Sequence, residues 1–218
     1  MLSTKYNRTY HFPFSPGTTS DDRILHDWQT MLEHEIVITE KLDGENNCLK
    51  SSGVYARSHA APTRNPWAKN AWEIWERVKD ELGDLEVFGE NLYGIHSIEY
   101  NNLHDYFHIF AIRDEGTFLS WDEVVFYAKL LDLPTVPVYE RGHFTEKELE
   151  KLILEGLKAG SQHGGECEGF VCRNVGQFDT EDFKYNVIKY VRANHVKTDE
   201  HWTRNWKRAK LWFEFATS

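Results

Sequence analysis

The order of hydrophobic and polar residues along the chain predicts short strands interspersed with amphipathic helices. Apolar, β-branched runs typical of strands cover residues 36–39, 85–92, 106–112, 169–172 and 186–191. Residues 47–50 and 54–57 flank Ser51-Ser52-Gly53 and predict a hairpin. These strands, with helices between them, indicate an α+β fold in which antiparallel sheets are flanked by helices.

Helix starts are marked by local capping signals. Asn65-Pro66 opens a helix that Gly83 ends. Two capping boxes, Ser120 with Glu123 and Thr145 with Glu148, each precede an apolar stripe. A shorter helix is expected from Ser20 or Asp21 to Met31, and the tail from Thr198 to Phe215 also has a helical pattern. With no internal repeat and no linker, we expect one domain over residues 1–197 and a helical extension over 198–218.

Composition narrows the class of protein. The chain of 218 residues is 40% hydrophobic and 14% aromatic, which is typical of a folded, soluble protein. It has no apolar run long enough to span a bilayer, and its first residues lack the apolar segment of a signal peptide. Cys48, Cys167 and Cys172 fit no metal-binding spacing, so we expect reduced thiols and a cytoplasmic location without membrane attachment.

Charge is distributed unevenly. The net charge of −10 argues against a general nucleic-acid coat protein. The segment from Lys184 to Lys210, however, carries eight Lys or Arg residues and only two acids. Its tryptophans and basic residues suit stacking on unpaired bases, although they equally suit a helix pinned to the core.

The stretch from Glu40 to Asn46 carries the strongest candidate chemistry. Lys41 ends an apolar strand, where a buried ammonium must be paired or lose its charge. A desolvated lysine among other cations has a lowered pKa and becomes a nucleophile. Taken alone, Asp43-Gly44 is also typical of a hairpin with an exposed lysine. The residues further along the chain decide between these two interpretations.

Three more charged residues lie on or beside apolar strands, namely Glu90, Glu168 and Lys189. Two lysines and two glutamates on separate core strands indicate a shared cleft in which the charges compensate one another. Carboxylates hold a divalent cation, which in turn neutralises a polyphosphate. This set suits attack by an amine on a nucleotide phosphate.

Five segments in order resemble the motifs of the covalent nucleotidyltransferases, the superfamily of ATP-dependent RNA and DNA ligases and mRNA capping enzymes. The segments are Lys41-Leu42-Asp43-Gly44, Phe88-Gly89-Glu90, Phe107-His108-Ile109-Phe110-Ala111, Glu168-Gly169-Phe170-Val171 and Ile188-Lys189-Tyr190. The resemblance covers roughly residues 36–192. Asn46 stands where DNA ligases and capping enzymes usually carry arginine, so the chain is similar to RNA ligases of the bacteriophage T4 second-ligase type.

The resemblance implies a nucleotidyltransferase domain and a three-step reaction. Lys41 would attack the α-phosphate of ATP and form a lysyl-AMP. The AMP would pass to the 5′-phosphate of RNA, and a 3′-hydroxyl would then displace it to form the phosphodiester. Each step is in-line phosphoryl chemistry that depends on positioning, cations and Mg²⁺ or Mn²⁺.

The resemblance also implies a role for each site residue. Glu40 would contact adenine and Phe110 would stack on it, although a plain core phenylalanine is an equal alternative. Asn46 belongs to the same nucleotide site. Arg57 would lie near the ribose or the RNA end, unless it is a surface arginine of the hairpin. Glu90 would hold the ribose or the waters of a metal ion, Glu168 the metal, and Lys189 the α-phosphate.

The chain departs from the family in two places. A second lysine is expected two residues after Lys189, but Val191 stands there, which leaves Arg192 or Lys184 as candidates. About twenty-five residues follow the fifth motif, too few for a separate OB domain, so a partner protein or the RNA would supply that surface. A small DNA ligase, a GTP-using capping enzyme and a non-catalytic nucleotide- or RNA-binding module remain alternatives.

Overall fold

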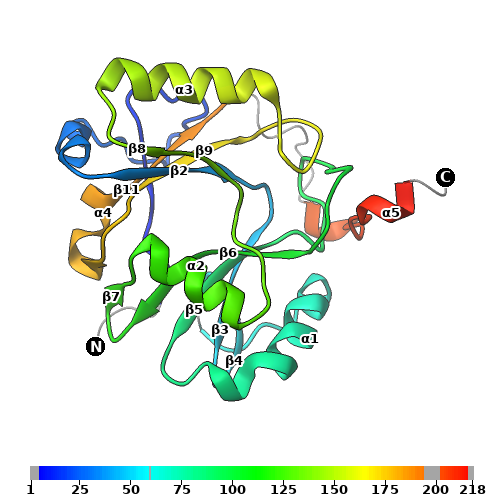
Figure 1. Ribbon diagram of the computed structural model, residues 1–218. Helices are drawn as coiled ribbons and strands as arrows, with labels where there is room; N and C mark the ends of the chain where they lie inside the picture. Colours follow the sequence, from blue (N-terminus) through cyan, green and yellow to red (C-terminus); the bar gives the residue numbers. More distant parts are fainter. Residues whose placement is uncertain (1–4, 59, 194–201, 216–218) are drawn as a thin grey trace.

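Two β-sheets form the body of the protein, as shown by a computed structural model that describes residues 5–58, 60–193 and 202–215 (Figure 1). The first sheet has the order β1-β11-β9-β2-β8 and the second the order β10-β7-β6-β5-β3-β4. The first contains β1 (Tyr10–His11), β2 (Ile36–Lys41), β8 (Val138–Gly142), β9 (Gly169–Asn174) and β11 (Val187–Val191). The second contains β3 (Glu45–Lys50), β4 (Gly53–Ala56), β5 (Glu86–Asn91), β6 (Phe107–Asp114), β7 (Thr117–Phe118) and β10 (Phe178–Asp179). All pairs are antiparallel except β1 with β11, which confirms the predicted α+β class.

Helices cover the outer faces of the two sheets. Helix α3 (Glu146–Ala159) lies on the first sheet, and α1 (Lys69–Val78) and α2 (Trp121–Leu130) flank the second (Figure 1). Both predicted capping boxes are formed, at the starts of α2 and α3. Leu149 and Ile153 of α3 are fully buried against the sheet, as their spacing on one helix face predicted. The remaining helical segments are η1 (Trp28–Glu33), η2 (Pro66–Ala68), η3 (Lys79–Glu81), η4 (Thr180–Asp182), α4 (Phe183–Asn186), η5 (Trp202–Arg204) and α5 (Trp212–Phe215).

The inner faces of the two sheets meet in an aromatic cluster. Phe88 and Cys48 from the second sheet pack in one buried cluster with Val187, and Val171 lies against it from the first sheet. Tyr6, from the N-terminal segment, contributes its ring to this cluster and lies 5.1 Å from Phe88. All three cysteines are buried as free thiols, as expected.

The chain passes from one sheet to the other directly after Lys41. Strand β2 ends at Lys41 in the first sheet, and β3 begins at Glu45 in the second. The hairpin interpretation of Asp43-Gly44 is therefore wrong. A Cβ atom on Gly44 would lie 2.5 Å from the carbonyl oxygen of Asn91, so the crossing requires glycine.

The N-terminal helix prediction is also wrong. Residues 20–27 form turns and bridges, and within residues 5–35 the only helical segment is the 3-10 helix η1. Asp22 accepts hydrogen bonds from the backbone and hydroxyl of Thr19, which closes a turn instead of capping a helix.

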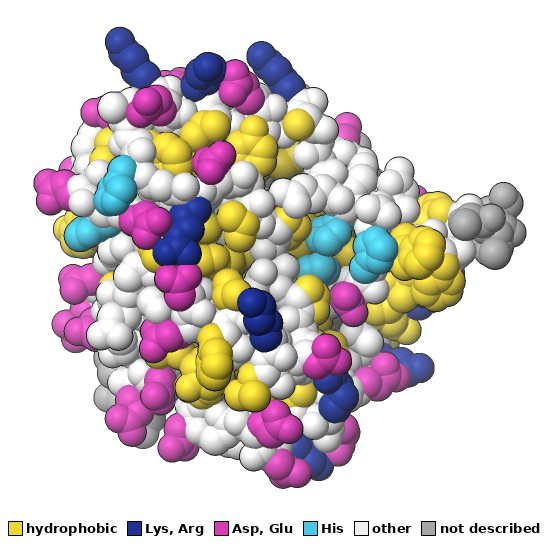
Figure 2. Space-filling model, in the orientation of Figure 1, with side chains coloured by type: hydrophobic (Ala, Val, Ile, Leu, Met, Phe, Trp, Pro, Cys, Tyr) yellow, Lys and Arg dark blue, Asp and Glu magenta, His cyan; other side chains and the backbone are white. Residues whose placement is uncertain are grey.

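The predicted C-terminal helix is interrupted. Within the described part of this tail, only Trp202–Arg204 and Trp212–Phe215 are helical. Between them the chain is extended, and Arg208 forms a β-bridge with Gly94. Tyr106 donates a hydrogen bond to the carbonyl of Ala209, which fixes this segment to the body. Residues 198–201 of the predicted helix, residues 216–218 of the predicted extension and the predicted boundary between 197 and 198 lie outside the described residues. Hydrophobic side chains gather on the surface at the end formed by α5 (Figure 2).

Candidate active site at the crossing between the sheets

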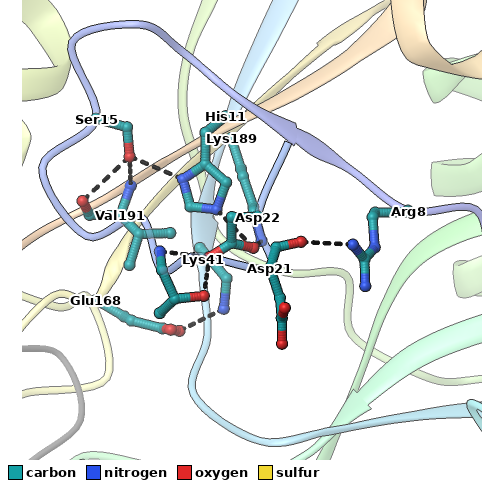
Figure 3. Close-up of polar contacts among 10 residues, drawn as sticks. Arg8, His11, Ser15, Asp21, Asp22, Lys41, Glu168, Lys189 and Val191 are labelled. Atoms are coloured by element: carbon teal, nitrogen blue, oxygen red, sulfur yellow. Dashed lines mark hydrogen bonds and ion pairs between the residues drawn. The ribbon is translucent and has the colours of Figure 1, made fainter. Parts of the chain in front are cut away.

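Lys41 is placed at the end of β2 with its ammonium on a carboxylate. Its Nζ atom lies 2.6 Å from Oε2 of Glu168, the residue that precedes β9 (Figure 3). The pairing of Lys41 with Gly169 across β2 and β9 produces this contact. The lysine side chain is 26% exposed and the glutamate 7%, so the pair is largely buried and does not lie in bulk solvent.

The ionisation of Lys41 differs from the sequence prediction. Burial acts to lower the pKa of Lys41, but the negative charges of Glu168 and Glu90 outweigh it, and the pKa is raised. The predicted lowering of the Lys41 pKa is therefore wrong in this arrangement of side chains. The lysine whose pKa is lowered is Lys189, through burial and the charge of Lys41.

Glu90 is the second carboxylate of the cleft. Burial raises its pKa to about 8, with Glu168 and Asp43 adding to the rise and Lys41 opposing it. Its Oε1 atom accepts a hydrogen bond from the backbone of Gly44, which joins β5 to the loop after the lysine. The Glu90 carboxyl is therefore largely protonated near pH 7, beside the ion pair of Lys41 with Glu168.

Asp43 and Gly44 shape the loop that follows the lysine. The carboxylate of Asp43 accepts the backbone N–H groups of Ser97 and Ile98 at 2.7 and 2.8 Å. Its own N–H donates to the hydroxyl of Tyr100. The Lys-x-Asp-Gly pattern thus acts mainly through the backbone, because the aspartate fixes the loop to residues 97–100 and the glycine allows the close crossing.

Asn46 lies opposite Glu90 in the β3–β5 pair. Its Oδ1 atom is buried and has no hydrogen-bond partner among the described residues. A buried acceptor without a partner is costly, so this atom fits a ligand hydroxyl or a metal-bound water. The sequence placed Asn46 in the nucleotide site, and its position beside Glu90 is consistent with that prediction.

Glu40 and Phe110 lie in different surroundings. Glu40 pairs across the sheet with Phe170, on the face of β2 opposite Lys41, and accepts the N–H of Gln162 at 3.0 Å. Phe110 lies in the second sheet with its ring 5.1 Å from the ring of Tyr6. Glu40 and Phe110 thus contact different partners, and their predicted contacts with adenine stay predictions.

Arg57 lines a hollow of about 480 Å³ together with Lys5, Tyr6, Asn7, Arg8 and Ser58. All three charged side chains of the lining are cationic, although the protein as a whole is acidic. The positive charge of Arg57 also acts to lower the pKa of Lys189, with burial as the main cause. Arg57 is exposed in the turn that follows β4, as a surface arginine of the hairpin would be, and its predicted place near the ribose or the RNA end stays a prediction.

Lys189 lies on β11, paired with Val171 of β9. Its nearest described acid is Asp22, whose Oδ1 atom lies 3.6 Å from Nζ (Figure 3). No site role for Asp22 is predicted from the sequence, because this residue lies in a turn-rich segment ahead of the first motif. The candidates for the second lysine are engaged elsewhere: Arg192 bonds to Glu166, and Lys184 lies over the ring of Tyr185.

The site residues fit a divalent cation only if water or phosphate oxygens supply its other ligands. Among the described residues, no three His, Cys, Asp or Glu side chains are grouped closely enough to hold a metal ion by themselves. Glu90 and Glu168 with the orphaned Asn46 oxygen supply an oxygen-rich wall, which suits Mg²⁺ or Mn²⁺ that keeps water and phosphate oxygens as its other ligands.

Comparison with known proteins identifies the family. The RNA ligase family profile matches residues 34–191. This chain belongs to the RNA ligase family. A search of curated proteins finds no match.

The fold of this RNA ligase family member resembles solved ligase structures. An archaeal ATP-dependent RNA ligase aligns with a TM-score of 0.55 and 18% identity over 84% of this chain and 48% of its own. A putative ATP-dependent DNA ligase from Aquifex aeolicus gives 0.56 and 20% over 86% and 50%. A mutant Naegleria gruberi RNA ligase with ATP and Mn gives 0.54 and 18% over 86% and 61%. These likenesses establish the nucleotidyltransferase fold, and the chain spans about half the length of the first two structures.

None of the helices formed by the described residues is long and apolar enough to cross a bilayer. The family match begins at residue 34, so the segment that contains Asp22 lies ahead of it.

Proposed function

We propose that this protein is an ATP-dependent RNA ligase that joins 5′-phosphate and 3′-hydroxyl RNA ends through lysyl-AMP and RNA-adenylate intermediates. The observation that carries the proposal is the position of Lys41, 2.6 Å from Glu168 and surrounded by further carboxylates. This position lies inside the segment matched to the RNA ligase family. Solved structures of the same fold include a Naegleria gruberi RNA ligase with ATP and Mn.

In the first step the Nζ atom of Lys41 forms a bond to the α-phosphorus of ATP, and the bond from that phosphorus to pyrophosphate breaks. Lys41 must lose a proton to act as the nucleophile, and Glu168 is the acceptor within hydrogen-bonding distance. Lys189 supplies positive charge for the phosphate, and Asn46 and Glu90 offer oxygen atoms to the ribose or to metal-bound water. A divalent cation on Glu90 and Glu168 would neutralise the polyphosphate.

In the later steps the AMP moves to the 5′-phosphate of RNA and is then displaced by a 3′-hydroxyl. The cationic hollow of Lys5, Arg8 and Arg57 suits a nucleic-acid phosphate. A cytoplasmic location and a partner protein that adds surface for the RNA remain part of the proposal.

Self-adenylylation tests the first step directly. The protein is incubated with α-labelled ATP or GTP and Mg²⁺, and label is followed on a denaturing gel. We expect label from ATP that is lost in Lys41→Ala and retained in Lys69→Ala, because Lys69 is an exposed residue of α1. Label only from GTP would indicate a capping-type enzyme, and no label would indicate a binding module.

The acceptor requires a second assay. Purified adenylylated protein is mixed with 5′-phosphorylated RNA or DNA, as single strands or as nicked duplexes, and the products are separated by size. We expect sealed RNA. Sealing of DNA alone would contradict the RNA assignment and favour the DNA ligase alternative, the class named for the Aquifex aeolicus structure of this fold.

A further inference from the structure

An N-terminal arm, residues 10–22, runs along β11 ahead of the segment matched to the family. Strand β1 of this arm pairs in parallel with β11, and His11 lies opposite Lys189. The N–H of Phe12 donates to the carbonyl of Lys189 at 3.0 Å. The arm therefore lies next to the lysine that is expected to contact the α-phosphate.

Asp22 is the acid that the arm brings to this lysine, and its two oxygens have separate partners. Oδ2 accepts the N–H and the hydroxyl of Thr19, each at 3.0 Å. Oδ1 lies 3.2 Å from Nε2 of His11 and 3.6 Å from Nζ of Lys189. One oxygen anchors the carboxylate to the arm, and the other lies near both His11 and Lys189 (Figure 3).

His11 and Ser15 connect Asp22 to the backbone of β11. Nδ1 of His11 lies 3.0 Å from the hydroxyl of Ser15, which accepts the N–H of Val191 at 2.9 Å. Burial and the charge of Lys189 lower the pKa of His11 to about 4, so the imidazole is neutral near pH 7. The connection thus consists of a close approach of His11 to Asp22 and of hydrogen bonds at Ser15, and not of a second ion pair.

Gly17 keeps the arm close to the same strand. Its N–H donates to the carbonyl of Val191, and a Cβ atom there would lie 2.4 Å from the carbonyl oxygen of Arg192. The arm thus holds both polar backbone groups of Val191. Val191 is the position at which the family resemblance leads us to expect a second lysine.

We propose that Asp22 is a positioning residue for adenylyl transfer, which fixes the ammonium of Lys189 beside Lys41 and is itself fixed to β11 through His11 and Ser15. This inference rests on the proposed function. A lysine has a long, flexible stem, so a fixed partner is needed to hold its charge in one place. The charges of Lys41 and Arg57 oppose the ammonium of Lys189, whereas those of Asp22 and Glu168 favour it.

The test is single-turnover self-adenylylation at saturating ATP. We expect Asp22→Asn to lower the rate constant about 10- to 100-fold, because a small misplacement of a catalytic group has effects of this size. Asp22→Glu should restore part of the rate. Asp21→Asn is the matched control, because this neighbouring carboxylate is exposed, and it should leave the rate unchanged.

A double-mutant cycle separates positioning from a general effect on the fold. If Asp22 acts through Lys189, Asp22→Asn should change the residual rate of Lys189→Ala less than about twofold. Equal losses in the two backgrounds would overturn the inference, as would an unchanged rate in Asp22→Asn alone.

A measurement without ATP distinguishes failure of this inference from failure of the proposed function. Competitive acylation followed by mass spectrometry reports the pKa of each lysine amine. We expect the Lys189 pKa to fall in Asp22→Asn, because the charge of Asp22 raises it, and not in Asp21→Asn. An unchanged Lys189 pKa would overturn the positioning contact even if the enzyme is active. Absence of label in the wild-type protein, with this pKa change present, would overturn only the catalytic role.

Discussion

The ammonium of Lys41 lies 2.6 Å from the Glu168 carboxylate, and this contact joins the end of β2 to the residue before β9. The contact has two opposing consequences for the proposed reaction. It aligns the amine at the wall of the cleft, and it keeps the amine protonated, because the carboxylates raise its pKa. A nucleophile held in this way becomes reactive only when the negative charge around it is neutralised.

Replacing Glu168 should therefore speed acylation of the Lys41 amine and slow the formation of lysyl-AMP. In Glu168→Gln the pKa of Lys41 should fall, so more of the amine is neutral and its acylation at pH 8 becomes faster. Formation of lysyl-AMP should nevertheless fall at least about 100-fold, because the predicted metal ligand is lost. Competitive acylation and α-labelled ATP measure the two effects on one preparation. Slower acylation of Lys41 in Glu168→Gln would contradict this account.

Acid should destabilise the protein through its buried histidines. Burial lowers the pKa values of His11, His96 and His163 to about 4, below the usual value near 6.5. Between these values the unfolded chain binds protons that the folded protein excludes, so the contribution of these histidines to stability is fully present above about pH 6.5 and is lost toward pH 4. Each histidine contributes a slope of up to about 1.4 kcal/mol per pH unit. Urea unfolding at several pH values measures it.

The variant His163→Gln tests one of these contributions. His163 lies with its ring 4.6 Å from that of His108, and its Nε2 atom has no hydrogen-bond partner among the described residues. Replacing His163 should reduce the slope of the free energy of unfolding against pH between about pH 4 and pH 6.5. A replacement of the same kind at His34, for which the structure gives only a backbone contact, serves as the control. Equal slopes in the wild type and His163→Gln would refute the assignment.

The close approach of the N-terminal arm to β11 should be sensitive to one methyl group. Gly17→Ala places a Cβ atom 2.4 Å from a backbone oxygen, so the arm must move, and we expect a loss of about 1–3 kcal/mol in the free energy of unfolding. Gly142→Ala is the control, since its nearest neighbour would be 3.5 Å away, in ordinary contact. Denaturant melts measure both. Similar stabilities of the two variants would show that the arm is not held in this position.

The cationic hollow should contribute to RNA binding and not to adenylylation. Lys5→Glu and Arg8→Glu should each weaken binding of 5′-phosphorylated RNA, with a salt dependence reduced by about 0.7 per lost contact. Fluorescence anisotropy across a salt series measures this. Lys151→Glu, an exposed change on α3, should have little effect. Equal weakening by all three variants would indicate nonspecific attraction, and a loss of lysyl-AMP would place the hollow in the first step instead.

Much of the architecture follows from local patterns. Apolar runs predicted the central strands β2, β5, β6, β9 and β11, and capping boxes predicted the starts of α2 and α3, since both signals depend on neighbouring residues alone. The edge strand β8, with an exposed and mixed sequence, carries no such pattern and was not predicted. The C-terminal tail has helical periodicity, but contacts with residues 93–106 hold its middle in an extended form.

The sequence by itself determined that Lys41, Glu90, Glu168 and Lys189 lie at strands of one core, because their charges interrupt apolar runs. Tertiary structure decided how these charges act. It raised the pKa of Lys41 by placing carboxylates around it, put Glu40 on the opposite face of β2, and brought Asp22 to Lys189 from a distant turn. Electrostatic interactions depend on distances through space, and a linear pattern contains those distances only within a single helix or strand.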